Sequence, residues 1–279
     1  MPENTLSDRA ALAALSTHFR PEQVASDLAS MPPNEVWRQR ALRDVSGRLA
    51  GYTPPDVLAD ARTACPFIIP SDPQWPAALD DLGPACPLGL WVRGHDQLPR
   101  LTANSVTVTG NRIASDQALA QAQVFARALA AAGHTVTATL AFGVDCAAQR
   151  AAAHEGHATL AVLPRGLDRA HPHANAPLLR SIPANGGAVV SLYPPGTVPS
   201  GVTLKDSARL LVALTGAVVL IEGADHSAAT HVAETALALK RPLFAVPASG
   251  DVRSSGNARL LSQQRAMPCP EPAYALALL

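Results

Sequence analysis

The sequence predicts an α/β protein with a doubly wound, mainly parallel sheet, preceded by a small helical region. From residue 105 onward, short valine-rich apolar runs alternate with longer alanine-rich runs at helical spacing. Strands joined by crossover helices pair in parallel with right-handed connections, and uninterrupted apolar strands suit a sheet covered on both faces. These observations indicate a Rossmann-like sheet. In such a sheet, ligands bind beyond the carboxyl ends of the strands, where the strand order reverses.

The chain divides into three expected regions. Residues 1–63 have apolar positions spaced by three and four, separated by prolines, and are expected to form the small helical region. Residues 64–100 form a proline-punctuated connector, in which the runs "FII" and "LGLWV" predict short strands. The second of these strands is expected to lead into the main sheet. Residues 101–279 form the Rossmann-like domain.

Within that domain, each expected strand is followed by an expected helix. The strands are residues 105–109, 135–139, 159–163, 188–191, 217–222 and 243–246. The helices are residues 116–131, 145–155, 175–184, 204–214, 227–240 and 256–264. The turns that follow the strands are therefore expected to gather at one edge of the sheet.

Composition restricts the class of protein. The 279 residues are enough to bury a substantial core, and the formal net charge is zero, so any site for an anion must be local. The four cysteines are scattered without a CxxC pair, as is usual in a reducing cytoplasm. No signal peptide is visible, and no run approaches the roughly 18 apolar residues of a membrane span. We expect a cytoplasmic protein with no membrane partner.

The first strand-to-helix turn, "TGNRIASD", predicts a phosphate site. Gly110 ends the strand, Asn111 and Arg112 lie in the turn, and Ser115 or Asp116 is expected to cap the next helix. A helix N-terminus favours an anion, and arginine adds a forked donor. A dinucleotide site would have three glycines where this turn has one. The alternative is a surface arginine on an ordinary turn.

Two further turns resemble the first in design. In "TLAFGVDCAAQ", Gly143 and Asp145 stand at a helix start, where Asp145 can cap the helix or accept a hydrogen bond from a ligand. In "VVLIEGADHSAATHVAE", a strand ends at Glu222 and a helix opens at Ser227. Both helix starts are expected to face the same cleft.

The turn "VLPRGLDRAHPHAN" is rich in polar residues. Arg165 and Gly166 follow the strand, and His171 and His173 have a spacing that can bind metal. No third or fourth ligand follows at a zinc-like spacing, so a polar loop lining the cleft is preferred over a metal site.

No catalytic group or cofactor is predicted. The sequence has no GxSxG, no HExxH and no Walker A lysine, and it shows no carboxylate pair with a clear task. Several helix starts and a few arginines at one sheet edge indicate that phosphates are bound rather than cleaved.

Seven segments, in order, are similar to the motifs of one family. They are "SDPQWPAALDDLGPACPLGLWVRG" at 71–94, "VTGNR" at 108–112, "ATLAFGVDCAAQ" at 138–149, "GLDRAHPHAN" at 166–175, "GGAVVSLYPPG" at 186–196, the segment ending "LFAVPA" at Ala248, and "SSGNARLLSQQRA" at 254–266. The family counterparts of the second and third are "VVGSR" and "SGLARGIDxxAH". Together these segments resemble the DprA/Smf family, bacterial single-stranded DNA-binding proteins of natural transformation.

This resemblance implies a function. It implies a Rossmann-like domain that binds single-stranded DNA in a pocket at the strand ends, without known turnover. It also implies a homodimer and transfer of the strand to the recombinase RecA. The residues that match the family's turns are Gly110, Arg112, Gly143, Asp145, Gly166, Asp168 and Asn175.

The chain departs from the family in its basic residues. The family's "FPxRNRIIAGL" corresponds to "LKDSARLLVAL" at 204–214, where Ser207 and Ala208 replace an arginine and an asparagine. Arg209 retains the second arginine, and Lys205 can substitute in part for the first. Because binding with fewer phosphate contacts is weaker and less dependent on salt, a thinner basic lining predicts weaker binding.

Phe142 stands where the family motif "SGLARGID" has its arginine. Its ring can offer a stacking face to a base, or it can pack in the core. The sequence alone leaves both open.

The sequence leaves two other functions open. One is a nucleotide-phosphate hydrolase of the lysine-decarboxylase-like (LOG) type, for which Glu234 is suggestively placed although the glycines of that family's turn are mostly absent. The other is a non-binding regulatory paralogue that keeps the fold for a protein partner.

Overall fold

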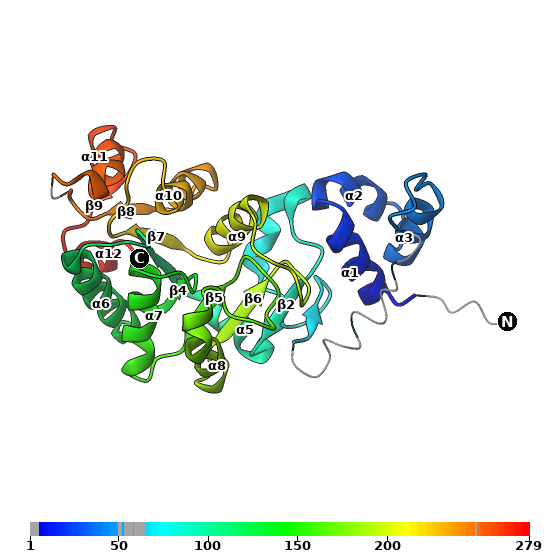
Figure 1. Ribbon diagram of the computed structural model, residues 1–279, viewed down its shortest axis with the longest axis horizontal. Helices are drawn as coiled ribbons and strands as arrows, with labels where there is room; N and C mark the ends of the chain where they lie inside the picture. Colours follow the sequence, from blue (N-terminus) through cyan, green and yellow to red (C-terminus); the bar gives the residue numbers. More distant parts are fainter. Residues whose placement is uncertain (1–5, 50–51, 53–57, 59–64, 249) are drawn as a thin grey trace.

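The computed structural model describes residues 6–49, 52, 58, 65–248 and 250–279 (Figure 1). Three helices, α1 (Asp8–His18), α2 (Pro21–Leu28) and α3 (Pro33–Leu42), form a group at one end of the molecule, shown in blue. They confirm the predicted helical region as far as residue 42. Most of the prediction for residues 50–64 lies outside the described residues.

The described strands form one mixed sheet of nine strands in the order β1-β2-β6-β5-β4-β3-β7-β8-β9. Pairing is parallel from β6 to β9 and antiparallel at β1–β2 and β2–β6. The strands are β1 (Phe67–Ile68), β2 (Leu90–Arg93), β3 (Ser105–Thr109), β4 (Thr135–Ala138), β5 (Thr159–Val162), β6 (Ala188–Ser191), β7 (Ala217–Leu220), β8 (Leu243–Ala245) and β9 (Met267–Pro268). The six predicted strands and their parallel pairing are confirmed.

The helices cover both faces of the sheet, as a doubly wound fold requires. On one face lie α5, α9, α10 and α11; on the other lie α6, α7, α8 and α12, with the N-terminal helices continuing that layer over β1 and β2. Their bounds are α5 (Leu98–Ala103), α6 (Asp116–Ala131), α7 (Val144–His154), α8 (Ala176–Ala184), α9 (Gly201–Ala213), α10 (Ala228–Ala238), α11 (Ser255–Ser262) and α12 (Pro272–Leu276).

Helix α9 begins three residues earlier than predicted, at Gly201 instead of residue 204. The hydroxyl oxygen of Ser200 accepts the Thr203 N–H, and the Thr203 hydroxyl oxygen accepts the Ser200 N–H. This reciprocal capping stabilises the earlier start. It also moves Lys205 from the first turn of the helix to the second.

The N-terminal helices share a core with the antiparallel edge of the sheet. Leu12 and Leu15 of α1 belong to the same buried cluster as Phe67 of β1 and Trp91 of β2. Arg9 adds a bidentate ion pair to the Asp72 carboxylate, at 2.6 and 2.8 Å. The residues of the expected connector thus extend the main sheet.

The strand order reverses beside β3. From β3 the chain builds the sheet outward through β4, β5 and β6, and it then returns to add β7, β8 and β9 on the other side of β3. The turns after β3 and β7 diverge to opposite faces of the sheet, which leaves a crevice between them. The fold therefore places the predicted phosphate turn at the position where such sheets bind ligands.

All four cysteines are free thiols, as expected. Among the described residues, none of the helices combines the length and apolar character that crossing a membrane requires.

Candidate nucleic-acid interface

Gly110 is required by packing at the end of β3. A Cβ atom there would lie 2.5 Å from Cγ2 of Val144 and 2.8 Å from the carbonyl oxygen of Glu222. Both distances are too short for a real contact, so only glycine allows β3, β7 and the start of α7 to come together. The single glycine of the first turn thus brings three elements close to one point.

Ser115 caps α6, one of the two residues expected there. Its hydroxyl oxygen accepts the Ala118 N–H, and its O–H donates to the Glu222 carboxylate at 2.6 Å. The buried Glu222 also accepts a hydrogen bond from the side-chain amide of Asn111 at 2.9 Å. A carboxylate can be buried only when donors surround it, and these donors join the first turn to the end of β7.

The side chain of Asn111 is fully engaged by the protein. Its amide nitrogen donates to Glu222 and to the carbonyl oxygen of Arg253, and its amide oxygen accepts the Ala224 N–H. No amide hydrogen of Asn111 remains for a phosphate. Asn111 was predicted to bind phosphate, but its side chain instead holds the turn in place.

Asp145 holds the first two turns together. Its carboxylate accepts hydrogen bonds from the hydroxyl of Thr109 at 2.9 Å, the N–H of Gly110 at 3.4 Å, and both the N–H and the hydroxyl of Thr139. Burial raises the pKa of this carboxyl group, and the four hydrogen bonds offset that rise only in part. Asp145 does not cap α7 with its side chain. It fixes the floor of the cleft by joining the ends of β3 and β4.

The second glycine is also a packing requirement. Gly143 has a φ of +79°, and a Cβ atom there would lie 2.1 Å from the carbonyl oxygen of Asn111. The α7 start therefore lies directly against the first turn. Gly166 is also required by close packing, since a Cβ atom there would lie 2.4 Å from the carbonyl oxygen of Pro194.

A cleft of about 390 Å³ opens above this floor, between the first turn, α9 and the start of α10. Its volume is typical of sites for small molecules or for one unit of a polymer. Among the predicted residues, those that line it are Gly110, Arg112, Asp145, Lys205 and Ser227. The fold thus brings together predicted side chains from four separate segments.

The start of α10 supplies donors to the cleft. Ser227 caps the helix by accepting the Thr230 N–H, as predicted for a helix opening there. Ala228 and Ala229 line the cleft in the first helical turn, where N–H groups have no partner within the helix. The aligned peptide dipoles add partial positive charge at this end.

The cations of the cleft are not neutralised. Arg112 and Lys205 are exposed, and neither has an ion-pair or hydrogen-bond partner among the described residues. The pKa of His171, on the cleft wall, is lowered by burial first and then by the positive charges of Arg112 and Arg165. The electrostatic environment of this histidine indicates that the cleft attracts anions.

Two predicted cations lie elsewhere. Arg209 forms an ion pair with Glu22 of α2 at 3.4 Å and lines two other hollows beside the N-terminal helices, one of which Lys205 also lines. Arg165 is half-buried with its Nε atom lacking a partner, and it acts on the cleft through its charge near His171. The loop that carries His171 and His173 holds no group of three or more possible metal ligands among the described residues.

Asn257 supports the site, although the sequence motifs do not single it out. The two hydrogens of its fully buried amide nitrogen are shared among three carbonyl oxygens, those of Leu220, Ile221 and Val246, and its amide oxygen accepts the Gly223 N–H at 2.8 Å. These contacts fix the turn that leads to α10. The local signal for Asn257 is a single asparagine that follows Gly256 in the segment "SSGNARLL".

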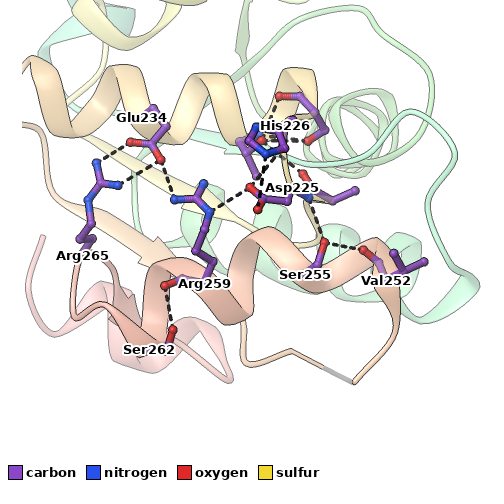
Figure 2. Close-up of polar contacts among 11 residues, drawn as sticks. Asp225, His226, Glu234, Val252, Ser255, Arg259, Ser262 and Arg265 are labelled. Carbon is purple, nitrogen blue, oxygen red and sulfur yellow. Dashed lines mark hydrogen bonds and ion pairs between the residues drawn. The ribbon is translucent and has the colours of Figure 1, made fainter.

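An ion-pair network fixes the same turn from α11 (Figure 2). The guanidinium of Arg259 lies between two carboxylates, 2.9 Å from Asp225 and 3.0 Å from Glu234. Arg265 pairs with the other oxygen of Glu234, and the hydroxyl oxygen of Ser255 accepts the Asp225 N–H. The α10 start is therefore held in place before any ligand arrives.

Comparison with known proteins agrees with this arrangement. Residues 66–277 match the family model described as DNA recombination-mediator protein A. The chain is 34% identical over 202 residues to a Mycobacterium tuberculosis protein described as a DNA processing protein DprA, a match that covers 69% of this chain. The chain belongs to the DprA/Smf family. The resemblance carried by the seven motifs is confirmed.

Other relatives extend the comparison. Escherichia coli Protein Smf is 31% identical over 210 residues, or 74% of this chain. These matches cover 51% and 54% of the two relatives, so the chain spans about half the length of the curated DprA/Smf proteins it matches.

Two solved structures share the fold. DprA from Streptococcus pneumoniae superposes with a TM-score of 0.73 and 26% identity, covering 98% of this chain and 93% of that one. DNA processing protein A from Helicobacter pylori superposes with a TM-score of 0.65 and 26% identity, covering 72% of this chain and 90% of that one. The Helicobacter protein is described as binding single-stranded DNA.

Proposed function

We propose that this chain binds single-stranded DNA in the cleft between the β3 turn, α9 and α10. The observation that carries the proposal is the pair of unneutralised cations, Arg112 and Lys205, beside the open start of α10. A phosphate between them would meet a guanidinium, an ammonium and free N–H groups. These are donors that suit a nucleic-acid backbone.

The size of the cleft favours a single strand over a duplex. A volume of about 390 Å³ accommodates a nucleotide-sized unit, whereas duplex DNA would have to lie across the rim. A single strand can turn its backbone or its bases into such a cleft because its nucleotides are not held in a paired stack.

The cleft supports binding more than hydrolysis. Glu234, the carboxylate that a LOG-type hydrolase would need, is held by Arg259 and Arg265 (Figure 2). Asp145 has its oxygens occupied by four protein donors. Neither carboxylate is available to act as a general base, so the hydrolase alternative has little support.

Family membership suggests where such binding would act. We infer a cytoplasmic role in DNA processing, natural transformation or recombination, with transfer of the strand to RecA and with a homodimer as the working form. The Helicobacter relative, described as a single-stranded DNA binder, supports the first step of this inference.

The experiment measures the affinity for an oligothymidylate across a salt series, with duplex DNA as control. We expect tighter binding of the single strand. We also expect the double variant Arg112→Ala/Lys205→Ala to bind more weakly, with the slope of log K against log salt reduced by about 1.4, or about 0.7 for each phosphate no longer neutralised.

A matched control removes the same two residue types elsewhere. Arg38→Ala/Lys240→Ala takes one arginine and one lysine from outside the cleft lining. It should leave the slope unchanged. If both double variants behave alike, the cleft is not the site; if the unmodified protein binds no oligonucleotide at any salt, the non-binding paralogue is favoured.

A further inference from the structure

A second hollow adjoins the cleft on the side of α6 and α7. It has a volume of about 800 Å³, and Arg112 lines both cavities. Phe142, in the turn before α7, is 50% exposed there, and Ile113, next to Arg112, is 87% exposed. Phe142 is therefore not a core residue. An exposed ring and an exposed branched side chain face one solvent-filled depression.

Positive charge surrounds these apolar side chains. Arg150 of α7 lines the hollow and donates to the neutral amide oxygen of Asn175 at 2.9 Å, and no carboxylate in the described part of the chain pairs with it. Arg112 has no partner among the residues that the structure describes. Arg127, also in the hollow, pairs with Glu155 at 3.4 Å. Two unneutralised guanidinium groups thus flank an exposed aromatic ring.

This combination fits one class of ligand. Proteins that bind single strands combine cations that follow the backbone with aromatic rings on which unstacked bases lie. Duplex DNA keeps its base faces covered, so it gains little from an exposed ring. A purely anionic ligand would gain nothing from Phe142 or Ile113.

We propose that Phe142 is a stacking platform for a base of the bound strand, adjacent to the nucleotide whose phosphate Arg112 holds. The inference rests on the proposed single-stranded DNA binding and extends it. Because Arg112 lines both cavities, a strand anchored there in the cleft would lead its next nucleotide into the hollow. The DNA footprint then continues from α10 across the first turn to α7.

Stacking and ion pairing leave different signatures in a salt series. Phe142→Ala should weaken binding of oligothymidylate by roughly 5- to 150-fold, which is the range for loss of one base–aromatic stack. The salt slope should stay unchanged, since no charge is removed. Phe142→Arg should instead raise the slope by about 0.7, because it adds a phosphate contact.

The matched control is Tyr274→Ala. Tyr274 of α12 is an aromatic residue of nearly the same exposure, 52%, outside the hollow. This variant should bind like the unmodified protein. An oligonucleotide with abasic sites should bind the unmodified protein about as weakly as Phe142→Ala binds the intact strand, and Phe142→Ala should not distinguish the two oligonucleotides.

A direct readout complements affinity. A 2-aminopurine base stepped along the strand should be quenched by the unmodified protein and by Phe142→Trp at one position, and not by Phe142→Ala. If Phe142→Ala is folded by circular dichroism and binds with unchanged affinity and quenching, the platform is refuted while strand binding stands. If the unmodified protein does not bind the oligonucleotide, the proposed function itself fails.

Discussion

Cations on two sides of α10 differ in whether they have carboxylate partners. Along the helix, Arg259 and Arg265 are each paired with carboxylates, and the pairs connect α10 to α11 (Figure 2). At the start of the helix, Arg112 and Lys205 have no partner among the described residues. The chain has as many acidic as basic side chains, yet these two cations of the cleft stay unneutralised.

This difference separates cations that are held in ion pairs from cations that remain available to a ligand. A guanidinium between two carboxylates contributes to the position of a turn, and it has no charge left for a ligand. A cation without a partner at a ligand-binding edge is available to a phosphate. A zero net charge therefore does not exclude a nucleic-acid interface, because the distribution of the charges decides.

The largest expected effect is a loss of stability in the turn that leads to α10, where Asn257 holds the backbone. Asn257→Ala removes a buried amide whose two hydrogens serve three carbonyl oxygens, and it leaves the Gly223 N–H without its acceptor. We expect the free energy of unfolding to fall by about 3 kcal/mol, measured by urea denaturation. Asn104→Ala, which removes a surface amide with one hydrogen bond, should cost about 0.5 kcal/mol or less. Equal losses in the two variants would contradict the role assigned to Asn257.

Glu234→Gln should lower the free energy of unfolding by a smaller amount, about 1 kcal/mol, because the ion pairs of Glu234 with Arg259 and Arg265 are half-exposed. Burial raises the pKa of Glu234, but Arg265 and Arg259 outweigh it and the net pKa is lowered. A lowered pKa adds stability above the unfolded value, near 4.5, that is lost as the pH falls through the folded value.

The two proteins should therefore converge in stability as the solution is acidified below about pH 4.5. Glu271→Gln serves as control, because the Glu271 carboxylate has no ion pair among the described residues, and it should be about as stable as the unmodified protein at neutral pH. If Glu234→Gln stays less stable than the unmodified protein in acid, altered packing and not the missing charge is responsible for its lower stability.

In the cleft, Arg112→Lys keeps the positive charge and removes the forked geometry of the guanidinium. The salt slope should be unchanged, since one cation remains. Affinity for oligothymidylate should fall by about threefold, because an ammonium cannot make the paired hydrogen bonds of a guanidinium. Fluorescence polarisation across the salt series checks both quantities. A slope that falls by about 0.7, the value for one lost phosphate contact, would mean that the lysine does not reach the phosphate.

The smallest expected effect is a pH dependence of binding. Because the pKa of His171 is lowered by burial and by nearby positive charge, folding disfavours its protonation and the free protein loses stability as the pH drops below about 6.5. A phosphate beside Arg112 would offset the positive charge and raise that pKa, so binding should take up a proton and strengthen as the pH falls. His171→Gln should remove this part of the dependence. Identical pH profiles would place the phosphate away from His171.

The fold and the parts of the cleft that depend on local patterns could be predicted from the sequence. The strand-to-helix turns at Gly110, Asp145 and Ser227 are recognisable because each follows an apolar run and opens a helix. Within each turn, these signals lie a few residues apart. Sheet topology then brings the turns together at a single edge.

The rest depends on contacts between distant segments. Arg209 was expected in the site, but it lies outside the cleft lining and pairs with Glu22, which is far away in the chain. The amide of Asn111 is occupied by Glu222 and Arg253, and no local pattern announces those partners. The exposure of Phe142 likewise depends on the neighbours that the fold gives it, so stacking and packing could not be separated from sequence.

The carboxylate of Asp145 joins two strand ends directly through four hydrogen bonds. The backbone that would face a phosphate is thus preorganised, and ordering it adds no entropic cost on association. Conformational adjustment would fall on the nucleic acid, which must unstack to follow a surface that does not yield. Sequences that stack weakly should consequently be held more tightly than those that resist opening.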